Sequence, residues 1–281
     1  MLLQLDGSDH DWLEARGPKL TLLAAIDDAT SEMVGGLFRE EEDAAGYFEW
    51  MLGISQAHGV PQAVYADRHT IFQSPVKATF EQEIAGRLPR SQFGRLMDEL
   101  EIELIEARSP QAKGRIERLF GTLQDRLVKE LREAGARTLT EANQVLLDYL
   151  SRFNARFSVA PREPGSAYRP WPANLVVEDT FCIKHQRTVN GDNTISFSGH
   201  TLAIPPDRHR GSYRRARVDV HQRLDGSLAI CYQGSTWVVY QPAADPPPRP
   251  APTARPQEPK APYRPAPDHP WRRYPTSLGH K

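Results

Sequence analysis

The sequence predicts an α/β fold with a mixed five-stranded sheet and flanking helices, followed by a small all-β barrel and a proline-rich tail. Short apolar strands alternate with amphipathic helices through residues 1–172, as is typical of a layered α/β domain. Short β-rich segments separated by turn residues follow over residues 173–241. Residues 242–281 then hold 13 of the chain's 24 prolines, so this tail cannot build a core and we expect it to be disordered.

Three antiparallel strands are expected first. The segments LLQLDG and MVGGLF stand on either side of the continuous apolar run Leu20–Ile26, and DDATSE supplies a turn before MVGGLF. A helix is predicted over residues 40–59, where Gly59 ends it before Pro61. The segment QAVYADRH predicts a fourth strand, and this topology makes it a neighbour of the first.

The segment QFGRLMDELEIELIEA predicts a further helix and the last strand, and two long helices follow. The first lies in SPQAKGRIERLFGTLQDRLVKELREAG and has an apolar stripe that predicts packing on the sheet. This stripe is formed by Ile116, Leu119, Phe120, Leu123, Leu127 and Leu131. The second helix is LTEANQVLLDYLSRFNARF, with Thr140 as its expected N-cap.

Charge divides the chain into an acidic and a basic part. Residues 1–106 carry a net charge of −12, and residues 107–281 carry +11. A simple nucleic-acid-binding domain would be basic throughout. The division suits a carboxylate-lined metal site beside a basic surface, although charge also varies along chains without functional meaning.

The sequence predicts neither a membrane span nor a signal peptide, and its two cysteines suit a reducing compartment. No apolar run reaches the roughly 18 residues of a membrane span, and the N-terminal segment lacks a basic region and a cleavage site. Cys182 and Cys231 suit reduced, buried thiols, and no CxxC or HxxxH spacing indicates a structural zinc site. We therefore expect a cytoplasmic protein without a membrane partner.

Three carboxylates stand where an α/β sheet tends to place catalytic groups. Asp6 ends the first apolar strand, Asp67 ends the fourth, and Glu117 lies in the first turns of a helix. Each of them alone is also explained as a turn or helix-terminus residue. Together they can converge, and a divalent cation would offset their mutual repulsion. Oxygen ligands favour Mg²⁺ or Mn²⁺ over zinc.

Residues near these carboxylates allow two interpretations. Asp27 and Asp28 are interpreted as turn-forming residues. Four others are candidates to contact a phosphate group, with a solvated surface position as the alternative in each case: His69, Lys113, Arg115 and Arg118.

The segments QLDGSDHDWLE, AIDDATSE, VYADRHTIF and SPQAKGRIERLFGTLQDRLVKEL resemble the integrase core of DDE transposases and retroviral integrases. The resemblance is closest to insertion-sequence transposases and covers residues 1 to about 160. Its most specific part is SPQxxGxxE, matched by Ser109, Pro110, Gln111, Gly114 and Glu117. It implies an RNase H-like fold and a catalytic, metal-binding triad of Asp6, Asp67 and Glu117.

The resemblance also implies a function. A transposase of this kind catalyses DNA cleavage and strand transfer with two Mg²⁺ or Mn²⁺ ions, acts on transposon ends and target DNA, and works as a homo-oligomer. Residues 173–241 resemble, more loosely, the β-domain that follows the core. Relatives carry helix-turn-helix domains before the core, whereas Met1 stands five residues before Asp6, so an N-terminally truncated copy is expected. A non-catalytic DNA-binding transposase remnant and an RNase H-like nuclease are the alternatives.

Overall fold

The structure, a computed structural model, describes residues 2–66, 90–106, 114–163, 165–166, 168–205 and 211–241. These residues lie within one compact unit. The predicted proline-rich tail, residues 242–281, lies outside the described part of the chain.

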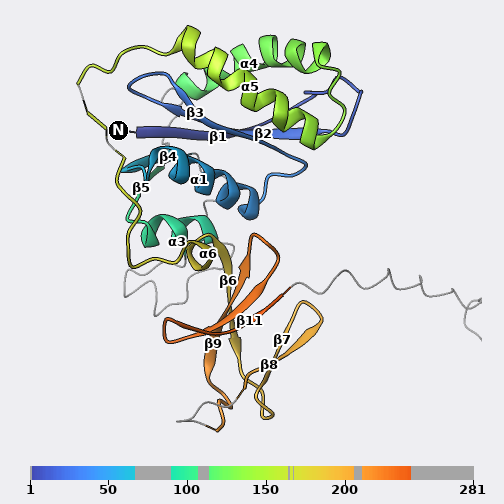
Figure 1. Ribbon diagram of the computed structural model, residues 1–281, viewed down its shortest axis with the longest axis vertical. Coiled ribbons are helices and arrows are strands. Elements are labelled where there is room, and N and C mark those ends of the chain that lie inside the picture. The colour runs from blue at the N-terminus through green and yellow to red at the C-terminus, as the bar shows by residue number, and fades with distance from the viewer. Residues whose placement is uncertain are drawn as a thin grey trace, which may run out of the picture. The chain divides into compact units, whose positions relative to one another are not determined.

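A mixed five-stranded sheet forms the centre of the first part of the chain (Figure 1). Its strands are β1 (Leu2–His10), β2 (Leu20–Asp27), β3 (Met33–Arg39), β4 (Ala63–Ala66) and β5 (Glu103–Glu106). They are arranged in the order β3-β2-β1-β4-β5. The first three strands are antiparallel, β4 is parallel to β1, and β5 is parallel to β4. The predicted mixed sheet, with its first and fourth strands adjacent, is confirmed.

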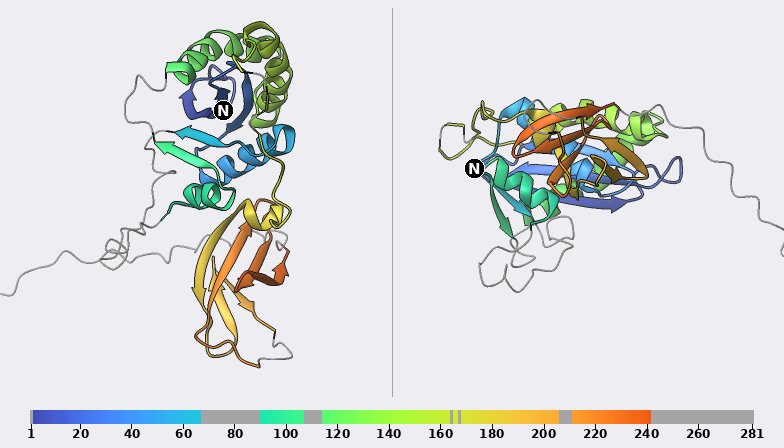
Figure 2. Two further views of the ribbon diagram at one scale, coloured as in Figure 1. Left: turned by 90° about the vertical axis from the view of Figure 1, so that its left-hand side faces the viewer. Right: turned by 90° about the horizontal axis from the view of Figure 1, so that it is seen from below.

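Helices cover both faces of this sheet, as the left view of Figure 2 shows. Helices α1 (Ala44–His58) and α3 (Gln92–Glu99) pack on one face, and α4 (Gly114–Glu133) and α5 (Leu139–Phe157) pack on the other. Strand β2 is buried along its whole length because successive side chains enter the two cores in turn. The stripe predicted on α4 is buried in the second core, as expected.

Helix ends follow local side-chain chemistry. Helix α1 begins at Ala44, four residues after the predicted start, because the Asp43 carboxylate accepts the Gly46 N–H at 2.8 Å and forms the N-cap. The N-cap of α5 is Thr138, so the assignment to Thr140 was wrong. The Thr138 hydroxyl accepts the N–H of Glu141 at 3.2 Å, and the Glu141 carboxylate accepts the N–H of Thr138 at 3.0 Å.

The segment after the α/β layers is all-β, as predicted. The short helix α6 leads into a four-stranded antiparallel sheet of order β11-β10-β9-β6, and β7 and β8 form a separate hairpin. The described strands thus form two antiparallel sheets, instead of one closed barrel, and both contribute to a single core. The elements are α6 (Val177–Thr180), β6 (Cys182–Thr188), β7 (Thr194–Phe197), β8 (His200–Ala203), β9 (Arg217–Arg223), β10 (Leu228–Tyr232) and β11 (Ser235–Tyr240).

Among the described residues, no helix combines the length and the apolar composition that crossing a membrane requires.

Candidate active site

Strand β1 presents Asp6 on the sheet face that α4 and α5 cover. Asp6 pairs with Ala24 of β2, and Ala24 is buried in the core beneath these two helices. Paired residues on neighbouring strands point to the same face of a sheet. The alternate neighbours Leu3 and Leu5 enter the opposite core, beneath α1. The side chain of Asp6, which is half-buried, is therefore directed toward the α4 layer.

Helix α4 runs alongside β1, and two hydrogen bonds fix its position. The side-chain oxygen of Gln4 accepts the backbone N–H of Ile116 at 3.2 Å, and the Ser8 hydroxyl accepts the side-chain amide of Gln124 at 3.2 Å. Eight helical residues rise about 12 Å, and four strand residues span about 13 Å. The helix and the strand therefore cover about the same distance between the two hydrogen bonds, and Asp6 lies midway between them.

Glu117 lies on the side of α4 that borders β1. It is seven residues before Gln124, which places the two side chains on nearly the same line along the helix. Its carboxylate is exposed and makes no ion pair with any described residue. Gly121 follows one turn later, and a Cβ atom added there would meet nothing within 4 Å. Within the described part of the chain, no atom therefore covers the helix surface at Gly121, one turn after Glu117.

A polar network around Gln4 holds the start of α4 to the strands. The Gln4 amide donates to the Asp28 carboxylate at 2.9 Å, and Arg115 of α4 forms an ion pair with the same carboxylate at 2.8 Å. Arg115 also donates to the Ser31 hydroxyl at 3.0 Å. Asp27 accepts the N–H of Ala29 at 2.9 Å, which confirms its interpretation as a turn residue. Sequence analysis missed Gln4 because an isolated glutamine in a strand has no distinctive pattern.

The cations of α4 are largely neutralised by nearby carboxylates. Lys129 pairs with Asp125, and Arg132 pairs with Glu14, besides the pair of Arg115 with Asp28. Arg118 and Arg126 form no ion pair in the described part of the chain, and of these two only Arg118 is exposed. Of the two predicted phosphate contacts on α4, Arg118 is thus the one whose charge is not already engaged.

Three predicted site residues belong to segments next to β4 and α4. Asp67, His69 and Lys113 lie outside the described residues, as do the SPQ residues of the SPQxxGxxE motif. Strand β4 is described up to Ala66, and its parallel pairing with β1 matches Leu3 with Val64 and Gln4 with Tyr65.

A second constellation of ligand-type side chains lies in the β-domain, formed by Asp179, His221 and Cys231. Sequence spacing did not reveal it, because its members come from three elements and are separated by 42 and 10 positions. Burial favours the neutral imidazole and lowers the pKa of His221. Burial likewise raises the pKa of the Cys231 thiol.

Comparison with known proteins gives relatives of one kind. No family model matches the chain. The chain is 36% identical over 236 residues to the "Putative transposase y4bF" of Sinorhizobium fredii, covering 83% of this chain and 50% of that protein. It is 32% identical over 238 residues to the transposase for insertion sequence IS1202 of Streptococcus pneumoniae, covering 82% of this chain and 48% of that protein. The chain is thus similar to transposases, one of them from an insertion sequence, and spans about half the length of these relatives.

Similar solved structures come from retroviral proteins. The HTLV-2 integrase catalytic core domain in complex with magnesium is 17% identical, with a TM-score of 0.37 over 52% of this chain and 81% of that chain. The simian T-cell lymphotropic virus intasome in complex with PP2A regulatory subunit B56 gamma is 14% identical, with a TM-score of 0.41 over 87% of this chain and 79% of that chain.

Proposed function

We propose that residues 1–172 are the catalytic core of a transposase that cleaves DNA and transfers strands with divalent metal ions, using Asp6, Asp67 and Glu117. The observation that carries the proposal is the relation between β1 and α4. Asp6 faces the α4 layer between two hydrogen bonds that tie strand to helix, and Glu117 lies on the edge of that helix. This relation supports a shared site for two carboxylates from distant parts of the chain.

Strand register supports the inclusion of Asp67. Gln4 pairs with Tyr65 in the parallel ladder between β1 and β4. Asp67 directly follows Ala66 in the chain and lies outside the described residues. Its place in the proposed triad therefore rests on the sequence, and the adjacency of β1 and β4 supports it.

The donor set fits hard divalent cations. Carboxylate oxygens are the ligands that Mg²⁺ and Mn²⁺ prefer, and Glu117 has no cation among the described residues to compete for its oxygens. When bound, two such ions activate the attacking oxygen and stabilise the leaving oxygen of a phosphodiester. The three carboxylates would hold the ions, and the DNA backbone would lie beside Gly121, where no described atom comes within 4 Å of an added Cβ.

Cations would orient the DNA without reading its sequence. Arg118 is the strongest candidate, because it lies next to Glu117 and pairs with no carboxylate in the described ranges. His69 and Lys113 retain the same proposed role from their sequence positions. Arg115 would act mainly through Asp28, by holding the start of α4 in place. Residues 173–241 and the basic tail, residues 242–281, are proposed as further phosphate-binding regions, and a homo-oligomer on DNA is proposed as the working assembly.

Plasmid nicking tests the proposal without knowledge of the transposon ends. The protein should convert supercoiled plasmid to open circles with Mg²⁺ or Mn²⁺, and chelation should stop it. Glu117→Gln should reduce nicking to background while leaving DNA binding intact, since only a metal ligand is lost. Glu133→Gln, at an exposed glutamate of the same helix, is the matched control. Normal nicking by Glu117→Gln would refute the triad. DNA binding without nicking by the unmodified protein would favour the non-catalytic remnant.

A further inference from the structure

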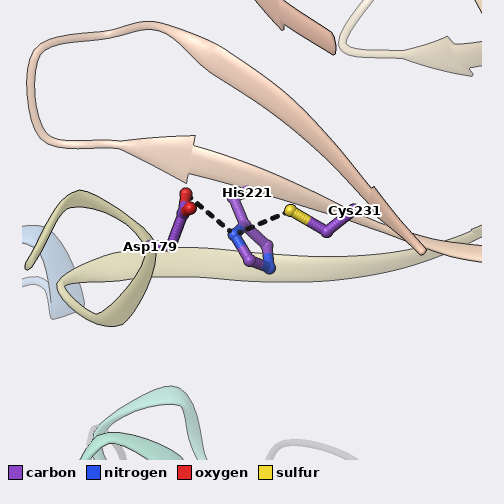
Figure 3. A group of neighbouring side chains, drawn as sticks. All are labelled: Asp179, His221 and Cys231. Carbon is purple, nitrogen blue, oxygen red and sulfur yellow. Dashed lines mark hydrogen bonds and ion pairs between the residues drawn. The ribbon is translucent and has the colours of Figure 1, made fainter. Parts of the chain in front are cut away.

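The β-domain contains a compact group of side chains that the proposed DNA chemistry does not use. Asp179 comes from α6, His221 from β9 and Cys231 from β10, and one potential ligand atom of each lies within 4.8 Å of the others (Figure 3). His221 and Cys231 are 7% and 5% exposed, so the group is largely shielded from solvent.

We propose that Asp179, His221 and Cys231 form a binding site for a single zinc-like transition-metal ion. A thiol, an imidazole and a carboxylate together are the ligand types that zinc takes in proteins, whereas Mg²⁺ avoids sulfur. Three protein ligands leave a fourth position for water or for the hydroxyl of Thr236. That hydroxyl lies 3.3 Å from the Cys231 sulfur and 2.9 Å from an Asp179 oxygen.

Two of the three distances between ligand atoms match the edges of a coordination tetrahedron, and the third lies within 4.8 Å. His221 Nδ1 lies 3.3 Å from Asp179 Oδ1 and 3.3 Å from Cys231 Sγ. With metal–ligand bonds of about 2.0–2.3 Å, neighbouring ligands around tetrahedral zinc lie roughly 3.3–3.6 Å apart. An ion could therefore enter after small side-chain adjustments, with loss of the Cys231 thiol proton.

The same geometry argues against a nucleophilic Cys-His-Asp triad. Such a triad needs the carboxylate and the nucleophile on opposite nitrogens of the imidazole. Here both contacts end on the same ring nitrogen, as the two dashed lines in Figure 3 show. The carboxylate, the imidazole and the thiol therefore converge on one point, as metal ligands do. A proton relay would need them in a line through the two ring nitrogens.

Arg223 is the outer partner of the site. It donates to Asp179 Oδ1 through Nε at 3.0 Å and through Nη2 at 2.6 Å. These bonds orient the carboxylate, as outer partners of metal ligands commonly do. Among the described residues, the other carboxylate oxygen, Oδ2, accepts a hydrogen bond only from the Thr236 hydroxyl. The positive charge of Arg223 also opposes a cation, so the predicted affinity is lower than that of a four-ligand structural zinc site.

Metal binding would link helix α6, at the start of the β-domain, to the four-stranded sheet that follows it. Helix α6 immediately precedes β6, the edge strand of that sheet, while His221 and Cys231 lie on its two inner strands. An ion shared by the three residues would hold α6 against β9 and β10. Since the ion binds only the folded arrangement, zinc should raise the unfolding temperature.

Cobalt and zinc titration of the untagged, chelator-stripped full chain tests the proposal. One equivalent of Co²⁺ should give visible bands of a tetrahedral ion and a thiolate charge-transfer band, and zinc should displace it. Zinc should also raise the unfolding midpoint by several degrees. Cys231→Ser and His221→Asn should abolish these signals, whereas His221→Cys should retain binding because a ligand is restored.

Cys182→Ser is the matched control. Cys182 is the other buried cysteine, and its thiol donates to the Asp179 carbonyl oxygen at 3.1 Å without joining the group. Its replacement should leave the cobalt spectrum unchanged. If Cys231→Ser does not fold, the thiolate charge-transfer band of the cobalt-bound unmodified protein tests the site by itself. A spectrum without thiolate charge transfer, or zinc binding that survives His221→Asn, overturns the site.

Discussion

The side-chain oxygen of Gln4 in β1 accepts the backbone N–H of Ile116 in α4 at 3.2 Å, although 112 positions separate the two residues. The amide of the same side chain donates to Asp28. Gln4 is 5% exposed, so a single buried side chain joins the first strand, the turn after the second strand and the start of the helix that carries Glu117.

Replacement of Gln4 should therefore affect both stability and chemistry. Gln4→Met keeps the shape but leaves the Ile116 N–H without its partner, which should cost about 1–3 kcal/mol of unfolding free energy. Nicking should fall as well, because the start of α4 is no longer held to β1. Gln124→Met removes a single hydrogen bond, which is less buried than that of Gln4, and should lower the unfolding free energy by no more than about 1 kcal/mol. Urea midpoints of both variants check this, and equal losses would contradict the central role of Gln4.

The packing of α1 on the sheet depends on a glycine in β3. A Cβ atom at Gly35 would lie 2.7 Å from Ile54 Cγ1 and 2.9 Å from Trp50 Nε1, both in α1. Gly35→Ala should therefore destabilise the protein by about 1–3 kcal/mol through overpacking. At exposed Gly53, within α1, an added Cβ meets nothing within 4 Å. Gly53→Ala should instead stabilise by about 0.5–1 kcal/mol. Thermal unfolding of the two variants should show shifts of opposite sign.

DNA binding should distinguish the two arginines beside Glu117. Arg118→Gln removes a charge that no described carboxylate pairs with, so affinity should fall and the slope of log K against log salt should decrease by about one. Arg115→Gln removes the partner of Asp28 and should lower thermal stability with a smaller change in salt slope. Fluorescence anisotropy at several salt concentrations measures both. If the salt slope of Arg118→Gln equals that of the unmodified protein, Arg118 does not contact the DNA backbone.

Acid should weaken the contact between the loop after β1 and the end of α4. Hydrogen bonds from Arg132 and then from Arg16 lower the pKa of Glu14 from 4.5 to about 2. Because the folded-state pKa is depressed, the stabilisation is present above pH 4.5 and is lost as pH falls toward 2. Glu14→Gln should lower the unfolding temperature at pH 7 by an amount that shrinks across this range. An equal loss of unfolding temperature at pH 7 and at pH 2 would contradict this role of Glu14.

The strand and helix pattern of the core was predictable because it follows from local periodicity. The all-apolar run of β2 indicated a strand buried on both faces, and the stripe on α4 indicated which side packs on the sheet. The N-cap of α5 was misplaced by two residues because Thr138 and Thr140 both carry the required hydroxyl. Only the reciprocal bond with Glu141 selects Thr138.

The sequence by itself determined the kinds of residue available at the candidate site and the elements that carry Asp6 and Glu117. The tertiary structure decided the face on which Asp6 lies, which of the α4 cations are already paired, and the meeting of Asp179, His221 and Cys231. Periodicity acts over a few residues, so it can be read along the chain. Contacts between residues 42 or 112 positions apart depend on strand register and helix placement, which only the packing of the whole domain establishes.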